Sequence, residues 1–258
     1  MSALLVFVGA ALIGAVATRA SRPLALATGA VANVRAERWH ESGRIPRLAG
    51  PALLVALMPW IDLDVLLVLT AFCAVGALDD LRPLGVAGKA VLLLVPSATA
   101  AWFTGEPWVA AACWITAISV NMLDHADGAA ASACAGSLLV AGGSIGLAGA
   151  GASAGFLTQN WPPARVFLGD GGSLMLGALL VLAWRDQGLV AWLIGSAVPL
   201  LDSAFVVVRR LRSRRKPWIG GTDHLGHELL RRGLPPGALP LLYASTAMLC
   251  AASWRLWS

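Results

Sequence analysis

The sequence predicts an all-α fold, a polytopic membrane helix bundle of about ten transmembrane helices, in a single domain over residues 1–258. Two observations predict it. Of the 258 residues, 58% are hydrophobic and 13% are charged, and the mean hydropathy is +0.74, whereas soluble domains average about 25% charged residues. The apolar residues are also grouped into separate runs of about 17 residues, close to the length that a membrane helix needs.

The expected helices follow these runs. Their ranges are 3–19, 47–60, 63–78, 88–104, 107–120, 128–142, 144–160, 172–185, 188–210 and 239–255. Because no basic residue precedes the first run, we expect a membrane helix there rather than a secretory signal. The four cysteines lie inside apolar runs without metal-binding spacing, so we expect them to pack as small hydrophobic residues.

Most basic residues fall in the connections on one side of the predicted bundle. By the positive-inside rule this side faces the cytoplasm. The formal net charge of +5 is then explained by topology and by anionic lipid, and no nucleic-acid partner is expected. Sixteen of the nineteen basic residues lie there: Arg22, Arg35, Arg38, Arg44, Arg47, Arg82, Lys89, Arg165, Arg209, Arg210, Arg212, Arg214, Arg215, Lys216, Arg231 and Arg232.

Carboxylates at the ends of apolar runs lie on the same predicted side. Asp79 and Asp80 end one run, and Asp170 precedes another. A charge at membrane depth costs about 2.5–3.5 kcal/mol, so such residues are functional candidates. Adjacent carboxylates repel each other. The pair fits either a metal-linked or acid–base site, or a helix-end charge pair answered by Arg82.

A second group follows the run that ends at Val120. Asn121, Asp124 and Asp127 are spaced three residues apart and share one face if the segment is helical. They could form one polar wall for a metal ion or a nucleotide. His125 then points elsewhere, and we expect it to be an interfacial or solvated residue.

Two later segments also carry candidate residues. Between Asn160 and Ser173, prolines end one helix and glycines let the backbone approach a ligand, so Asp170 fits either a Mg²⁺ ligand or a simple N-cap. His224 and His227 fit phosphate contact or proton transfer better than a zinc site. Asp202 lies within an apolar run, where we expect it to pair with an arginine.

Together these motifs make the chain resemble the polyprenyl-phosphate N-acetylhexosamine-1-phosphate transferases, a family that includes phospho-N-acetylmuramoyl-pentapeptide transferase. The resemblance runs from about Arg44 to Gly233. Each motif is weak alone, but five in the family's order on one predicted side are specific. They are residues 44–50, 78–80, 121–128, 162–173 and the basic segment that ends at His227.

The resemblance implies a membrane enzyme that depends on Mg²⁺, with Mn²⁺ as an alternative ion. Its activity would be the transfer of a sugar 1-phosphate from a UDP-sugar to a polyprenyl phosphate, with release of UMP, in cell-envelope synthesis. GlcNAc-1-phosphate is favoured over phospho-MurNAc-pentapeptide as the transferred group. The active site would face the cytoplasm from a multi-pass chain in the inner membrane, and a homodimer is left open.

The resemblance also implies roles for individual residues. It leaves open whether the acceptor attacks directly or an aspartyl intermediate forms. The implied metal ligands are Asp124 and Asp170; the implied catalytic residues are Asp79, Asp80, Asp170, His224 and His227; the implied substrate-binding residues are Lys89, Asn121, Asp127, Asn160, Arg209 and Arg210.

The chain departs from the family pattern at a few positions. Ala49 stands where the family has glycine, His125 where glycine or asparagine is common, Gly171 where threonine or serine is common, and Gly226 in place of a histidine. These changes put sugar specificity in doubt more than chemistry. Two other interpretations remain: an ion-coupled transporter, which predicts acids at mid-depth and paired repeats, and an inactive family-like protein.

Overall fold

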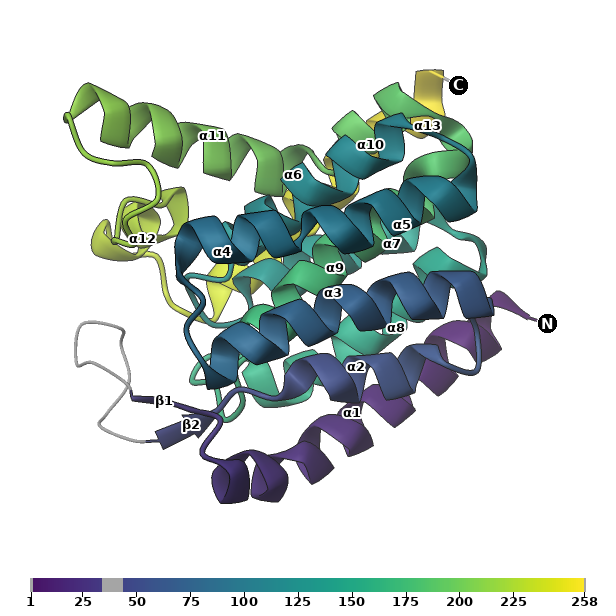
Figure 1. Ribbon diagram of the computed structural model, residues 1–258, viewed down its shortest axis with the longest axis horizontal. Coiled ribbons are helices and arrows are strands. Elements are labelled where there is room, and N and C mark those ends of the chain that lie inside the picture. The colour runs from purple at the N-terminus through teal and green to yellow at the C-terminus, as the bar shows by residue number, and fades with distance from the viewer. Residues whose placement is uncertain (1, 34–43, 258) are drawn as a thin grey trace.

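A computed structural model describes residues 2–33 and 44–257, and it is a bundle of helices (Figure 1). Each expected range contains a helix, and two ranges contain a broken pair. The helices are α1 (Ala3–Thr28), α2 (Ala49–Leu57), α3 (Leu63–Leu81), α4 (Gly85–Leu92), α5 (Leu94–Thr104), α6 (Trp108–Leu123), α7 (Ala129–Ala141), α8 (Gly143–Asn160), α9 (Gly169–Trp184), α10 (Leu189–Gly195), α11 (Ala197–Arg212), α12 (Leu225–Arg231) and α13 (Ala238–Trp257), with a 3-10 turn η2 (Arg185–Gln187).

The expected range 188–210 is bent rather than straight. The axes of α10 and α11 differ by 71° across the break at Ser196. Pro199 lies in the first turn of α11, where a missing N–H breaks no helical hydrogen bond. The bend directs α11 away from the bundle, so that its basic end, Arg209 to Arg212, projects beyond the other helices (Figure 1).

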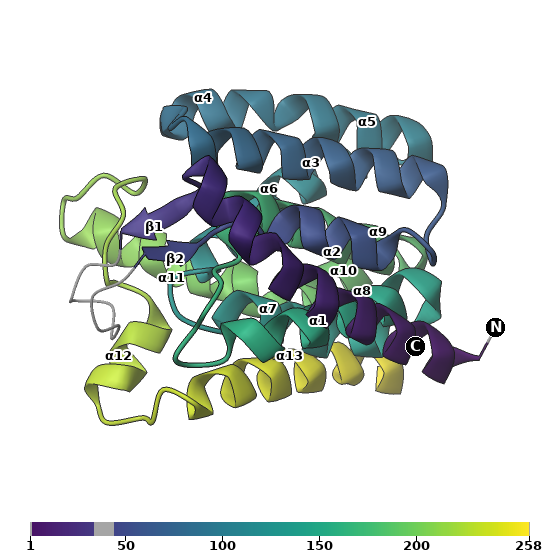
Figure 2. The ribbon, with the colours of Figure 1, turned by 90° about the horizontal axis from the view of Figure 1, so that it is seen from below.

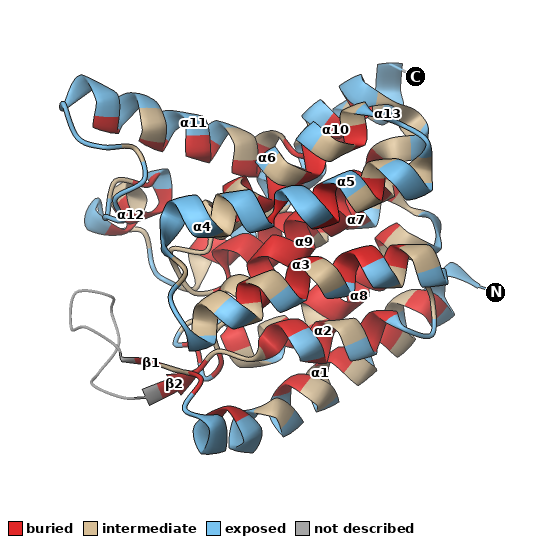
Figure 3. Ribbon diagram, in the orientation of Figure 1, coloured by how far each residue is buried: buried red, intermediate tan, exposed pale blue. Residues whose placement is uncertain are grey.

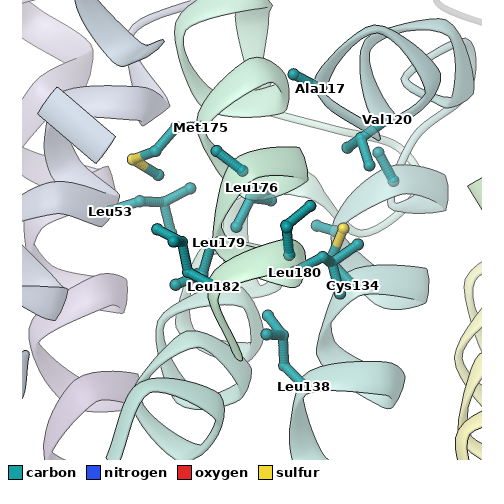
Figure 4. Packing of buried hydrophobic residues seen from close by; sticks show 14 of the residues in the cluster. Leu53, Ala117, Val120, Cys134, Leu138, Met175, Leu176, Leu179, Leu180 and Leu182 are labelled. Atoms are coloured by element: carbon teal, nitrogen blue, oxygen red, sulfur yellow. The ribbon is translucent and has the colours of Figure 1, made fainter. Parts of the chain in front are cut away.

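Helix α9 forms the centre of the core. Almost every side chain along it is buried, on all faces, whereas α1 and α5 are buried on one side and no residue of α4 is fully buried (Figure 3). Leu176, Leu179 and Leu180 of α9 pack among side chains of the surrounding helices, including Leu138 of α7 and Leu53 of α2 (Figure 4). A helix that is apolar all round must be enclosed by protein or lipid. Here it is enclosed by protein.

The expectation of an all-α fold is confirmed, and a short ribbon that the sequence did not predict is added to it. Strands β1 (Val31–Asn33) and β2 (Arg44–Pro46) pair antiparallel, with Ala32 opposite Ile45. The ribbon lies at the same end of the bundle as α12 (Figures 1 and 2). The Pro46 carbonyl accepts a hydrogen bond of 2.8 Å from the Phe167 N–H, which ties the ribbon to the segment that leads into α9.

Membrane spans are supported for part of the bundle. By length and apolar composition, two helices of the described residues can cross a membrane, Ala3–Thr28 and Gly85–Thr104, and the bent α10–α11 pair would make a third. The expectation of about ten crossings goes beyond this finding and stays a prediction. Of the basic residues used to predict orientation, Arg35 and Arg38 lie outside the described residues.

Candidate functional site

Three oxygen atoms from distant parts of the chain surround the ammonium group of Lys89. The Lys89 Nζ lies 3.1 Å from Asp79 Oδ2 and 3.4 Å from Asn121 Oδ1, and it forms a very short contact with Asp170 Oδ2. These residues come from α3, α4, α6 and the first turn of α9. The prediction that acids from separate segments converge at one end of the bundle is therefore confirmed for Asp79 and Asp170.

Asp80 holds the beginning of α9. Its Oδ2 accepts a hydrogen bond of 3.1 Å from the Gly171 N–H, and its Oδ1 lies 3.5 Å from Arg47 Nη1. The first N–H groups of a helix have no partner within the helix and attract negative charge. Asp80 thus occupies the end of α9 that attracts negative charge.

Glycines bring the backbones of these helices together. A Cβ atom on Gly76 of α3 would lie 2.3 Å from both the carbonyl carbon and the carbonyl oxygen of Asp170. A Cβ on Gly50 of α2 would lie 2.7 Å from the carbonyl carbon of Gly171. Real Cβ atoms do not approach backbone so closely, so glycine is required at both positions. Asp79 and Asp80 follow Gly76 by one turn of α3, so this close approach places Asp170 beside the turn that carries them.

The charge of this cluster favours a further cation. Three carboxylates, Asp79, Asp80 and Asp170, face two cations, Lys89 and Arg47, which leaves a formal charge of −1. Carboxylate and carboxamide oxygens are the ligands that Mg²⁺ prefers. Asp79, Asp170 and Asn121 therefore fit a magnesium ion by donor type.

The loop before α9 is held by residues that the resemblance placed near the nucleotide. The Asp127 carboxylate accepts a hydrogen bond of 2.8 Å from the Ala164 N–H. Asn160 is buried, accepting from the Gly128 N–H and donating to the Val166 carbonyl, both at 2.9 Å. These bonds give both side chains a role in loop structure. Their predicted contact with substrate stays a prediction.

The polar wall expected from the 121–127 segment is divided. Asn121 lies in the last turn of α6, where its amide donates to Ser173 Oγ at 2.9 Å. Asp124 follows as the residue that ends the helix, and its metal-binding role stays a prediction. Because the helix stops at Leu123, the helical spacing that aligned the three residues does not extend to Asp127.

A second polar cluster joins the α6–α7 connection to α11 and α12. Asp202 Oδ2 lies 2.7 Å from His224 Nδ1, and Asp202 Oδ1 accepts from the Leu225 N–H at 3.2 Å. The expectation that Asp202 pairs with an arginine is therefore wrong. The kink at α10–α11 turns Asp202 toward the segment before α12 instead.

His125 lies within this cluster and not in solvent. Its ring stacks on His224, with centroids 4.2 Å apart, and lies 4.5 Å from the ring of His227. The alternative of a solvated His125 is therefore wrong, because the chain turns after Leu123 and directs the ring toward α12, while an interfacial position stays a prediction. Ligand atoms of His125, Asp202 and His224 lie within 4.8 Å of one another, close enough for one metal ion.

Arg209 and Arg210 belong to a third group. Arg210 is 4% exposed. Its guanidinium group donates hydrogen bonds to Asp223 Oδ2 at 3.0 Å and to the Pro217 carbonyl at 2.6 Å. Arg215 reaches the other Asp223 oxygen at 3.0 Å, and Arg209 donates to the Asp223 carbonyl at 3.4 Å. Burial alone would raise the pKa of Asp223, but the bond from Arg210 and the charge of Arg215 outweigh it and lower that pKa. The group orders the connection from α11 to α12.

The segment that carries the lysine–aspartate cluster matches a known family. The family model described as glycosyl transferase family 4 matches residues 63–185, which include Asp79, Asp80, Lys89, Asn121 and Asp170. This match places the cluster inside the family 4 segment, whereas His224, His227 and Arg210 follow it.

Curated proteins match the chain over shorter stretches. A Streptomyces coelicolor protein described as a glycosyltransferase is 38% identical over 50% of this chain and 36% of its own length. The phospho-N-acetylmuramoyl-pentapeptide-transferase of Kosmotoga olearia is 37% identical over 35% of this chain and 31% of its own length. The undecaprenyl-phosphate alpha-N-acetylglucosaminyl 1-phosphate transferase of Pasteurella multocida is 32% identical over 34% of this chain and 27% of its own length. The matched stretches therefore span about a third of these relatives.

The positions of two residues, Asp202 and His125, were not predicted from the sequence. Asp202 was expected to pair with an arginine, although the bend at Ser196 and the return of the chain at Asp223 bring a histidine closer. His125 was placed by helical spacing, which does not extend beyond the end of α6. The αL glycine Gly128, which precedes α7, is the sequence signal that could have marked this turn.

Proposed function

We propose that the chain is a phosphoglycosyl transferase that moves a sugar 1-phosphate, GlcNAc-1-phosphate in the first instance, from a UDP-sugar to a polyprenyl phosphate and releases UMP. The observation that carries the proposal is the convergence of Asp79, Asp170 and Asn121 on Lys89 within the family 4 segment. The names of the relatives support both the transferred group and the acceptor class.

The reaction joins two anions, and the proposed site answers their repulsion. An oxygen of the acceptor phosphate bonds to the β-phosphorus of the donor, while the bond from that phosphorus to the bridging oxygen breaks and UMP leaves. Mg²⁺, held by Asp170 and Asp124 as the resemblance implies, with Asp79 and Asn121 as further oxygen donors, would supply charge neutralisation for the diphosphate. Lys89 adds a positive charge beside the same oxygens and orients the phosphate that enters.

The two adjacent aspartates have different surroundings, which supports different roles. Asp80 is fixed by the Gly171 N–H and Arg47, so we assign it to positioning the first turn of α9. The Asp79 carboxylate accepts hydrogen bonds from the Leu84 N–H at 2.7 Å and from Lys89 Nζ at 3.1 Å, and it is more exposed than the Asp80 carboxylate. We assign Asp79 to keeping the acceptor phosphate deprotonated, or to attacking the donor first as a nucleophile. His224 and His227 contact phosphate or sugar in this proposal.

The proposal also places the protein in a membrane, with its site on the cytoplasmic side. The acceptor carries an isoprenoid tail, so the enzyme works in the bilayer, with about ten helices crossing it and the site facing the cytoplasm. The basic residues of the β2, α4 and α11 ends support this orientation. A cysteine-labelling map that placed residue 125 on the outer side would contradict it.

A donor screen tests the function. Purified protein in detergent receives undecaprenyl phosphate and each of UDP-GlcNAc, UDP-GalNAc and UDP-MurNAc-pentapeptide, and lipid-linked product and UMP are measured with Mg²⁺, with Mn²⁺ and with EDTA. We expect a UDP-GlcNAc-dependent product that EDTA abolishes and either ion restores. A lack of product from every donor, from protein that remains folded, would refute the proposal.

A further inference from the structure

Gly226 leaves a space that the ring of His125 fills. A Cβ atom on Gly226 would lie 2.6 Å from His125 Cε1 and 3.2 Å from His125 Nε2, and 2.9 Å from the Tyr243 hydroxyl oxygen. The φ angle of Gly226 does not lie in the left-handed region, so the backbone itself would accept an alanine. The glycine at this position is therefore required by the approach of His125 and Tyr243.

From that space His125 contacts two other imidazoles. It stacks on His224 with an interplanar angle of 29° and lies tilted by 34° against His227, whereas the centroids of His224 and His227 are 5.9 Å from each other. The His125 ring thus contacts both other rings, which are farther from each other than from His125. His224 and His227 are 5% and 7% exposed, so a change in the position of His125 moves rings that have little room of their own.

A shared metal ion would need a different ring arrangement. Imidazole binds a metal through a lone pair in the plane of the ring, so the ligating rings point their edges at the ion. The rings of His125 and His224 instead lie face to face. His224 Nδ1 is also directed at Asp202, which fixes the ring from its other side. The His125 ring is therefore placed to pack against His224 and not to share a metal ion with it.

We propose that His125 is a positioning residue that fills the volume left by Gly226 and holds His224 and His227 in the orientation that they use. Asp202 fixes the Nδ1 edge of His224, and His125 fixes its face. The contact joins the α6–α7 connection, which also carries Asp124, to the beginning of α12. The part that concerns turnover rests on the proposed function, whereas the packing part does not.

A double-mutant cycle measures the packing part without substrate. Thermal unfolding in detergent is recorded for the unchanged chain, Gly226→Ala, His125→Gly and the double variant. We expect Gly226→Ala to lower the melting temperature, since its methyl group displaces the His125 ring. In the His125→Gly background the same alanine should cause a clearly smaller loss, because only the Tyr243 hydroxyl, 2.9 Å from the new Cβ, remains close. Gly237→Ala is the matched control, since its Cβ would meet Trp161 Nε1 at an ordinary 3.5 Å.

His125→Phe separates packing from the chemistry of the ring nitrogens. A phenyl ring preserves the stack without a proton or lone pair, so we expect it to keep the melting temperature and most of the turnover. His125→Gly should lower kcat by about 10- to 100-fold with a smaller change in KM for the donor, as displaced catalytic groups do.

Three outcomes would overturn the proposal. The first is equal loss of melting temperature from Gly226→Ala in both backgrounds, and the second is full kcat in His125→Gly. The third is a loss in His125→Phe as large as in His125→Gly, which would make His125 a catalytic residue. If the unchanged chain shows no transfer activity, the proposed function fails, while the unfolding cycle still decides whether His125 and Gly226 are coupled.

Discussion

Replacing Gly76 by alanine should displace Asp170 from Lys89. The new Cβ would lie 2.3 Å from the Asp170 carbonyl group, and ordinary contact begins at 3.4 Å, so α3 and α9 must separate by about 1.1 Å. A displacement of about 1 Å lowers turnover by roughly 100-fold in a site that depends on alignment. Overpacking costs about 1–3 kcal/mol of unfolding free energy, from which the better helix propensity of alanine subtracts about 1 kcal/mol.

The matched control is Gly88→Ala in α4. Its Cβ would meet only Leu84 Cβ, at 3.8 Å, so the same substitution one residue from Lys89 should keep activity and raise stability by up to about 1 kcal/mol. Turnover is measured by UMP release and stability by thermal unfolding in one detergent. The reasoning about helix separation is refuted if Gly76→Ala matches Gly88→Ala in both measurements.

Three further substitutions test the charges. Asp170→Asn should lower turnover at least about 100-fold while the protein still inserts into membranes, and retained turnover would remove Asp170 from the proposed metal site. Lys89→Met leaves Asp79 and Asp170 without their cation and should cost about 3 kcal/mol in unfolding free energy, with partial recovery on adding Mg²⁺; a melting temperature equal to that of the unchanged chain would contradict this. Because Arg210 and Arg215 lower the pKa of Asp223, its ionised form adds stability that is present above about pH 3.9 and is lost as the pH falls through the lowered pKa. Melting temperatures from pH 7 to pH 3 should therefore fall more steeply in the unchanged chain than in Asp223→Asn, and parallel curves would count against the ion pairs.

The sequence was informative about helices and about the cluster around Lys89. Hydrophobic runs are local, so they predicted a helix in each range, and charges at the ends of those runs predicted that Asp79 and Asp170 gather at one end. Local patterns do not report bends. The break at Ser196 and the end of α6 at Leu123 depend on how neighbouring helices pack, and they decide the partners of Asp202 and His125.

The β1–β2 ribbon was missed for a related reason. Its strands have three residues each, too short for an alternating pattern to be distinct from a loop. The motif Arg44 to Gly50 was recognised only as one of the five motifs of the resemblance, and no structural role was predicted for it. In the structure its Arg47 reaches Asp80 and its Pro46 carbonyl holds Phe167, so part of the motif is a support for the beginning of α9.

The enclosure of α9 has a consequence for how the surrounding lipid acts on the protein. At sixteen residues, α9 is shorter than the bilayer core, and its side chains are covered by the neighbouring helices. Bilayer thickness acts on helices that touch acyl chains, which here would be the longer α1 and the α4–α5 pair with their exposed apolar faces. Since Lys89 is on α4 and Asp170 is on α9, a thicker or thinner membrane would strain the contact between an outer helix and a sheltered one. Turnover at the proposed site should therefore depend on the thickness of the surrounding bilayer.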